Sequence, residues 1–188
     1  HYGNGNPDVD ALAARIVSHV SELCLRYRLD CGGRFLPLFA ANVQNISAGA
    51  ETGATPDGRR AGEPLSDAAS PFFGRDRHGP TAFMQSIASP DYSHVSGGSV
   101  VNIKFSPGHF SGEDGARLFV AITRAFVRSR IQEMQFNFTS QADLEEASRN
   151  PEKYGNLVVR VSGFSAYFTR LDPAVQRDVI NRRSHQKL

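Results

Sequence analysis

Apolar residues recur at spacings of three and four in the first part of the chain, after Pro7 and before Gly32. These residues are Val9, Leu12, Ala13, Ile16, Val17, Val20, Leu23, Cys24 and Tyr27. Asn6 and Pro7 suit a helix start, because an asparagine side chain caps the first turn and the proline ring fixes a helical φ. The pattern predicts an amphipathic helix that packs on a larger body.

The middle of the chain lacks such a period. Residues 34–39 are apolar enough for a short strand, but the following stretch, up to Gly98, is rich in glycine and proline and shows no sustained pattern. A structureless loop of that length is uncommon in a compact domain and is more often functional. We therefore expect a long functional loop between residues 40 and 98.

Regular patterns return in the second half. Residues 99–105, 133–138 and 157–161 are apolar segments that predict strands. Ser111, Ser140 and Asp172 each stand at the start of a predicted helix, the last of which runs through Arg183. The inner stripe expected for the first of these helices is Ala116, Phe119, Val120, Thr123, Phe126 and Val127. Strands that alternate with helices predict an α/β fold with mainly parallel pairing.

Composition narrows the class of protein. The chain has 188 residues, 40% of them hydrophobic, and a net charge of +2, which is typical of one folded domain rather than a disordered chain. Its basic residues are dispersed, so we expect no nucleic-acid partner. There is no apolar run of membrane-spanning length and no signal peptide at the start, which predicts a cytoplasmic protein with no membrane association. A start at His1 without Met indicates an excised piece.

Common catalytic and binding motifs do not occur. The two cysteines, Cys24 and Cys31, are too few for a disulfide framework, and the six histidines are scattered, so no metal site is expected. Glycine-rich phosphate loops and the G-x-S-x-G turn of serine hydrolases are also missing.

One segment near the end needs a different explanation. Gly163 follows the β-prone residues 157–161, and apolar residues come after it where a surface turn is usually polar. On this local pattern alone, the glycine supplies a positive φ at a strand end, which is its commoner use. The longer string RVSGFSAYF, residues 160–168, closely resembles the glycyl radical signature of the pyruvate formate-lyase-like glycyl radical enzymes.

This resemblance covers essentially the whole chain. Further segments are similar to that family in the same order and spacing: YGNGNPDVDALA at residues 2–13, ATPDGRRAGEPLSDAASP at 54–71, GPTA at 79–82, NIKFSP at 102–107 and QFN at 135–137. Several independent motifs in register are far more specific than any single one.

The resemblance implies that Gly163 is the catalytic radical site, with Arg160, Ser162, Phe164 and Ser165 supporting its loop. Glycine suits a backbone radical because the residue must become planar, and we expect that a side chain at this position would clash with its neighbours when the residue flattens. The apolar residues that follow fit a site that excludes water and oxygen. We expect Arg160 to be a buried anchor of the loop; the alternative is an exposed strand arginine.

The family also implies partners and a larger fold. The radical is a protein-derived cofactor, installed by an activating enzyme that uses S-adenosylmethionine and an iron-sulfur cluster, and no other cofactor is expected. It passes to an upstream cysteine, which becomes a thiyl radical and attacks a small-molecule substrate. Neither Cys24 nor Cys31 has the sequence context of that cysteine.

The implied fold is α/β, the carboxyl-terminal part of a ten-stranded α/β barrel. We expect residues 1–110 to belong to the barrel, including the PDGR loop, and residues 111–188 to form the glycyl radical domain. Without the remainder of the barrel and its cysteine this chain is expected to be inactive, whereas the complete protein is expected to be a homodimer.

Several functions stay open from the sequence. The motifs look most like the eliminating branch, whose members cleave C–O, C–N or C–S bonds anaerobically as dehydratases and lyases. Alternatives are an autonomous spare-part glycyl radical cofactor protein, part of a formate acetyltransferase, arylacetate decarboxylase or fumarate-adding enzyme, or a degenerate module without the radical. Substrate-binding residues are not assigned.

The radical glycine must reach two partners, so we expect the segment from about residue 157 onward to move. The last helix is expected to act as a lid, and its outer side is expected to hold Arg177, Asp178, Arg182 and Arg183.

Overall fold

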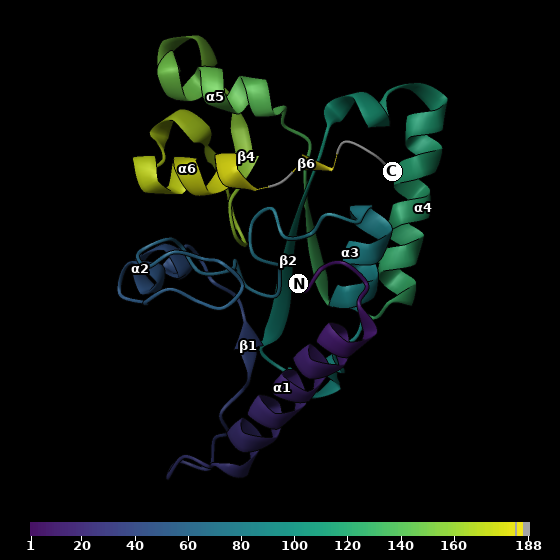
Figure 1. Ribbon diagram of the computed structural model, residues 1–188, viewed down its shortest axis with the longest axis vertical. Coiled ribbons are helices and arrows are strands. Elements are labelled where there is room, and N and C mark those ends of the chain that lie inside the picture. Colours follow the sequence, from purple (N-terminus) through teal and green to yellow (C-terminus); the bar gives the residue numbers. More distant parts are fainter. Residues whose placement is uncertain (183, 186–188) are drawn as a thin grey trace.

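The computed structural model describes residues 1–182, 184 and 185, and a parallel sheet lies at its centre (Figure 1). The central strand is β2 (Gly98–Phe105). β3 (Glu133–Asn137) pairs along one edge of β2, while β1 (Leu38–Phe39) and β6 (Ser184–His185) pair with the beginning and the end of the other edge. All three pairings are parallel, as the sequence predicts for the main sheet.

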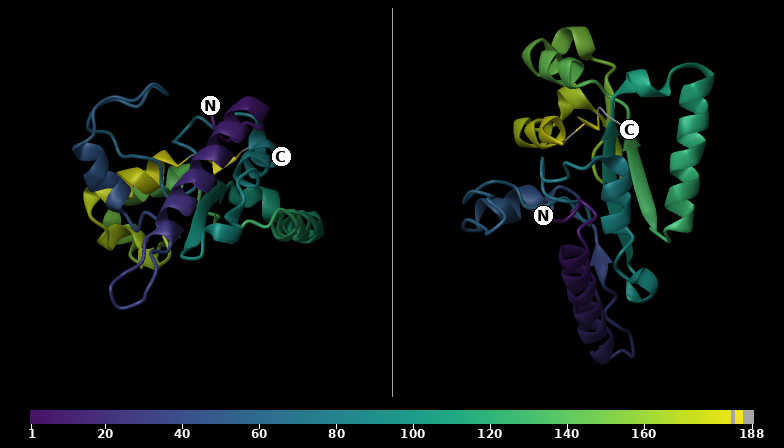
Figure 2. Two further views of the ribbon diagram at one scale, coloured as in Figure 1. Left: turned by 90° about the horizontal axis from the view of Figure 1, so that it is seen from below. Right: turned by 45° about the vertical axis from the view of Figure 1, so that its right-hand side comes forward.

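Within the described residues, six α-helices lie around this sheet. They are α1 (Pro7–Arg26), α2 (Gln44–Ala50), α3 (Gly79–Ile87), α4 (Gly112–Arg128), α5 (Gln141–Arg149) and α6 (Pro173–Asn181). Figure 1 and the right-hand view of Figure 2 place α4 on one side of β2 and β3 and place α5 and α6 on the other. No helix within the described residues is both long and apolar enough to cross a membrane.

A first hydrophobic core lies between the sheet and the helices α3 and α4. Its buried members are Phe83, Met84, Ile87, Val101, Ile103, Phe105, Ile122, Ile131 and Met134. The strands contribute alternate residues to it, because successive side chains of a strand point to opposite faces. On β3, Met134 therefore faces this core while Gln135 points to the other side.

A second, smaller core is built by the carboxyl-terminal elements. Strands β4 (Val158–Arg160) and β5 (Ser165–Tyr167) form an antiparallel hairpin that packs with α5 and α6. The buried members are Leu144, Ala147, Val159, Val161, Phe168 and Val179. The predicted strand at residues 157–161 therefore exists, but it pairs antiparallel with its own continuation, since only two residues separate the paired positions Val161 and Phe164.

The middle of the chain has more regular structure than its sequence indicates. Residues 44–50 and 79–87 are the helices α2 and α3, which the composition conceals because both are short and lie among glycines and prolines. Conversely, the strand expected at 34–39 is limited to Leu38–Phe39, while Arg34 forms an isolated bridge with Arg28.

The helix starts agree better with the sequence than the helix faces do. The side chains of Asn6, Ser140 and Asp172 accept hydrogen bonds from the first turns of α1, α5 and α6. On α1, however, the apolar stripe is largely exposed, with Leu12 at 53% and Ile16 at 55%. On α4 the buried residues are Gly115 and Ile122, whereas the expected Phe119, Val120 and Val127 are exposed. An apolar stripe does not distinguish the face that this chain covers itself from a face that it leaves open.

Candidate radical site

Gly163 lies at the tip of the β4–β5 hairpin. The backbone N–H of Val161 donates to the carbonyl of Phe164 at 2.9 Å, so Ser162 and Gly163 are the two tip residues. Gly163 has a φ of +79°, in the left-handed region that glycine adopts without strain. A Cβ built at this position meets no atom within 4 Å, apart from its chain neighbours. In this conformation it is therefore the backbone dihedral, and not crowding, that favours glycine at residue 163.

The two residues before Gly163 are tied down by buried polar groups. The Ser162 hydroxyl donates to Oδ1 of Asp67 at 3.3 Å and accepts from the backbone N–H of Asn42, also at 3.3 Å. The carbonyl of Val161 accepts from Nη1 of Arg182 at 2.6 Å. The exposed tip thus has a rigid, buried base.

Arg182 is the centre of this polar network. Its Nη2 lies 2.9 Å from Oδ2 of Asp178 and 3.2 Å from Oδ2 of Asp67, and all three side chains are less than a tenth exposed. Asn102 of β2 donates to Asp67 at 2.6 Å, and Asn45 of α2 donates to Asp178 at 3.0 Å. A buried charge is tolerated when it is paired and hydrogen-bonded, and here one guanidinium serves two carboxylates.

Burial shifts the protonation of two groups in this network. Desolvation raises the pKa of Asp67, and the nearby Asp178 raises it further, against the opposing effect of Arg182. Desolvation also lowers the pKa of Lys104 to about 8, and the positive charge of Arg182 adds to that effect. The Lys104 ammonium donates to Oε1 of Gln141 and to the carbonyl of Ile180, at 2.9 and 3.2 Å. It therefore links the end of β2 to both α5 and α6.

Gly163 itself receives one side-chain contact from β3. Its backbone N–H donates to Oε1 of Gln135 at 3.1 Å, and Gln135 is buried. Two residues further along the same face of β3, Asn137 exchanges two hydrogen bonds with the backbone of Arg160, at 2.9 and 3.0 Å. The hairpin is thus held to the main sheet by side-chain amides.

Three comparisons with known proteins bear on this geometry. A model of the glycine radical family matches residues 65–169, which is more than half of the chain and includes the whole hairpin. The chain belongs to this family, that of the glycyl radical enzymes. The match confirms the family resemblance drawn from the sequence motifs.

Individual members of the family match almost the whole chain. The probable dehydratase YbiW of Escherichia coli is 37% identical over 98% of this chain, and an isethionate sulfite-lyase of Nitratidesulfovibrio vulgaris is 36% identical over 98%. The solved glycerol dehydratase of Clostridium butyricum superposes with a TM-score of 0.95 at 37% identity, over 99% of this chain. The chain has the fold of a part of these enzymes, because it spans only about a quarter of their length: 24%, 22% and 24%.

The structure corrects two residue assignments in this glycyl radical domain. Arg160 is not the buried anchor: its side chain is partly exposed and donates to the Ser165 hydroxyl at 3.4 Å. The buried arginine that holds the loop is Arg182. Asp178 and Arg182 are also not on the outer side of α6, since they are 1% and 7% exposed and bind each other; Arg183 lies outside the described residues.

The remaining loop residues are open to solvent in this glycyl radical chain. Gly163, Phe164 and Ser165 are all exposed, Phe164 at 39%, and Tyr167 is stacked under the guanidinium of Arg170. The apolar shield expected around the glycine is therefore not closed by the described residues themselves.

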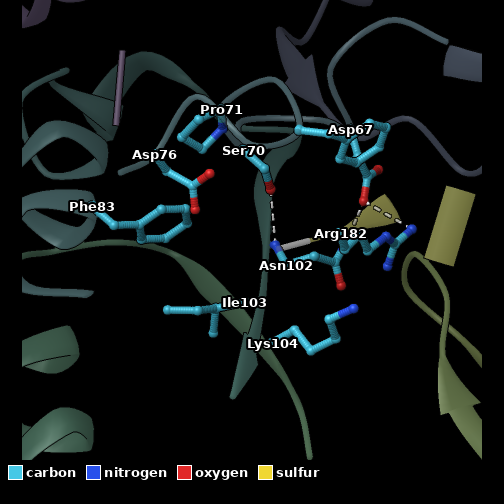
Figure 3. Close-up of a pocket in the computed structure, with 10 residues that line it drawn as sticks. Asp67, Ser70, Pro71, Asp76, Phe83, Asn102, Ile103, Lys104 and Arg182 are labelled. Atoms are coloured by element: carbon cyan, nitrogen blue, oxygen red, sulfur yellow. Dashed lines mark hydrogen bonds and ion pairs between the residues drawn. The ribbon is translucent and has the colours of Figure 1, made fainter. Parts of the chain in front are cut away.

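The polar network borders a small cavity of about 30 Å³ (Figure 3). Asp67, Asn102, Lys104 and Arg182 line one side, and Asp76 and Phe83 line the other. This volume suits about one water molecule and not a substrate. A much larger open groove, of about 910 Å³, lies elsewhere, between α1, α3 and α4, and is lined mainly by small and apolar residues such as Ala14, Met84 and Ala125.

The sequence does not predict a functional role for the residues of the polar network. Asp67 and Gln135 lie within the motifs that resemble the family, but Arg182 and Asp178 lie in no quoted motif. The PDGR loop, in contrast, has a local structural role: Arg59 is 2% exposed, and its guanidinium binds the backbone carbonyls of Thr52, Gly53 and Glu63. No cluster of three or more potential metal ligands occurs within the described residues.

Proposed function

We propose that this chain is the part of a glycyl radical dehydratase or lyase that stores the radical on Gly163. The observation that supports this most directly is that the family match includes Gly163, and that this residue combines a positive φ, an exposed tip and a rigid buried base. Arg160, Ser162, Phe164 and Ser165 form the rest of the loop.

The geometry of the tip suits hydrogen-atom removal. A Cα radical is stabilised when the residue flattens, so that the amide nitrogen and the carbonyl both conjugate with the carbon. The open space around Gly163 allows this change, and the attacking group can approach from the solvent side. Residues 161 and 162 stay fixed by Arg182 and Asp67 while the tip changes shape.

The proposed partners follow from the chemistry. A radical S-adenosylmethionine enzyme with an iron-sulfur cluster installs the radical, and a cysteine in the remainder of the barrel, outside this chain, receives it. The thiyl radical then cleaves a C–O, C–N or C–S bond of a small substrate anaerobically, in a cytoplasmic homodimer. We propose residues 1–110 as barrel and 111–188 as the radical domain. The chain alone is inactive because it lacks that cysteine loop.

The elimination of water or sulfite is favoured by the relatives. Dehydratases and sulfite-lyases are both among the proteins that match nearly all of this chain. A spare-part radical protein is the second candidate, and it is distinguished by the length of the encoded product: a relative-sized product supports the enzyme, and a product of about this length supports the spare part.

The decisive experiment uses the complete protein and its activating enzyme under strict anaerobiosis. Electron paramagnetic resonance should show an organic doublet that collapses when glycine is deuterated at Cα, and Gly163→Ala should abolish both the doublet and turnover. Air should then cut the chain next to residue 163 and release a fragment that begins at residue 164. A normal doublet in the alanine variant would refute the assignment, and no doublet in the wild type would indicate a degenerate module.

A further inference from the structure

The side-chain amide of Gln135 forms a hydrogen bond with the backbone of Gly163, the proposed radical centre. Gln135 lies on β3, where Met134 and Phe136 face the first core and the alternate residues face the hairpin. Its Oε1 accepts the backbone N–H of Gly163 at 3.1 Å, although the two residues are 28 apart in sequence. The side chain is 5% exposed, so water competes little for this contact.

A second hydrogen bond fixes which end of the amide faces the glycine. Nε2 of Gln135 donates to Oε1 of Glu133 at 2.6 Å. A carboxylate accepts only, so the nitrogen of the amide must face Glu133 and the oxygen must face Gly163. The chain of contacts therefore runs from the Gly163 N–H through the Gln135 amide to the carboxylate of Glu133. Such chains polarise, which makes Oε1 a stronger acceptor than an isolated amide oxygen.

This contact acts on the atom that would share the unpaired electron. When a hydrogen atom leaves Cα of Gly163, one C–H bond breaks and a new bond to hydrogen forms on the attacking carbon-centred radical. The amide proton stays on nitrogen, and no net charge moves. An acceptor on the N–H increases electron density on that nitrogen, which strengthens its donation into the half-filled orbital on Cα. It also holds the nitrogen in place while the carbon flattens.

We propose that Gln135 is a catalytic residue of the radical domain. Its Oε1 stabilises the Gly163 radical by accepting a hydrogen bond from the backbone N–H of that glycine. This inference rests on the proposed function of Gly163. Asn137 makes a useful contrast, because it faces the same side of β3 and binds the hairpin, but it binds the backbone of Arg160 and not that of the glycine.

The test compares matched variants of the complete protein after anaerobic activation, with ¹⁵N-labelled glycine. Gln135→Leu removes the acceptor at similar size, and Asn137→Leu weakens the hairpin without touching Gly163. The double variant Glu133→Gln/Gln135→Glu keeps an acceptor opposite Gly163 and a donor amide between the two side chains. Radical content per chain, the anaerobic lifetime of the radical and the ¹⁵N hyperfine coupling are measured by electron paramagnetic resonance. One neutral hydrogen bond corresponds to about a fivefold change in an equilibrium.

We expect Gln135→Leu to lower radical content or lifetime by about fivefold and to change the ¹⁵N coupling. The double variant Glu133→Gln/Gln135→Glu should keep the wild-type lifetime, and Asn137→Leu should keep the wild-type coupling. Equal couplings and lifetimes in wild type and Gln135→Leu would overturn the inference while leaving Gly163 as the radical site. If Gln135→Leu does not fold, Gln135→Met decides, because its unbranched side chain also lacks the amide oxygen: a ¹⁵N coupling and a lifetime equal to those of the wild type refute the proposal. A wild type without a doublet refutes the function itself.

Discussion

The core beneath α3 and α4 is enclosed by apolar side chains from the central sheet, whereas the core beneath α5 and α6 meets that sheet mainly through polar groups. In the first core, Phe105 packs against neighbouring rings such as Phe110, 5.2 Å away between centroids. Between the second core and the sheet lie the Asp67–Arg182 ion pair, the Asn137–Arg160 hydrogen bonds and the Lys104 contacts. Within the described residues, Val43 is the apolar side chain from the amino-terminal half that packs on the second core.

This difference has a mechanical consequence. Apolar packing is non-directional and is lost gradually, but hydrogen bonds and buried ion pairs hold one defined geometry and are broken one at a time. A unit joined by polar contacts can separate as a whole while its own core stays intact, because local opening costs less than global unfolding. The construction suits the proposed movement of the radical loop between two partners.

Deletion of one ring from each core should give the largest effects. Phe105→Ala and Phe168→Ala each remove a fully buried ring and should each cost about 3–5 kcal/mol. Limited proteolysis of the complete protein with mass spectrometry should show cleavage confined to residues 140–181 for Phe168→Ala, and cleavage in both units for Phe105→Ala. Val127→Ala, at a position that is 67% exposed, is the control. The same cleavage pattern in both core variants would mean that the two cores open together.

The sequence predicts the core of the main sheet well and its surroundings poorly. Strands β2 and β3 are recognisable because their apolar residues are continuous or alternate within a few positions. The faces of α1 and α4 are not predictable from this chain alone, since an apolar stripe is equally expected on a surface that another part of a larger protein covers. The sequence does not predict the hairpin, because its second strand is only three residues long, 165–167, and follows the first strand after a very short turn at Ser162 and Gly163.

The candidate site, like the fold, has one part that the sequence predicts and another that it does not. Gly163 is recognisable because its signature is a continuous string of nine residues. Its anchors are not, because Asp67, Gln135 and Arg182 come from three distant segments and meet only when the sheet and α6 are in place. Arg160 is the arginine nearest to Gly163 in sequence, which is why the sequence favours it as the anchor. In the structure its backbone binds Asn137 while its side chain faces outward.

The ion pair that joins the two units should have the next largest effect. Arg182→Met leaves the buried Asp67 and Asp178 without their common cation and should cost about 3 kcal/mol. Asp67→Asn should cost less, because Arg182 keeps Asp178 as its partner. Hydrogen exchange of residues 158–167 in the complete protein measures both effects. In the double variant the costs should not add, since each single change already breaks the joint; strictly additive costs would show that the pair does not join the units.

Lys104 should make this joint sensitive to pH. Burial lowers its folded pKa to about 8, below the ordinary 10.5, so between these values the unfolded state binds more protons than the folded state. The penalty for burying the charge is therefore complete below pH 8 and is relieved as pH rises. From pH 8 to 9.5 the opening free energy of α6 should increase by about 2 kcal/mol. Exchange rates referenced to unfolded peptides should show this rise in wild type, and Lys104→Met should remove it; a parallel rise in both proteins would assign it to another group.

The smallest effect is expected from an ion pair with the same sequence spacing as Arg182 and Asp178 but with opposite burial. Glu113 and Arg117 form an i,i+4 pair on α4, with side chains 80% and 72% exposed, against 1% and 8% for the buried pair. Exposed pairs contribute about 0.3–0.5 kcal/mol because water and salt screen them. Arg117→Ala should therefore change exchange in α4 by no more than about twofold, and 1 M salt should erase the difference. The cost of Arg182→Met should survive the same salt, because no ions enter its surroundings. If salt diminished the costs of Arg117→Ala and Arg182→Met equally, the joint between the two units would be open to solvent. The contrast between the apolar core and the polar joint would then no longer explain how the hairpin is held.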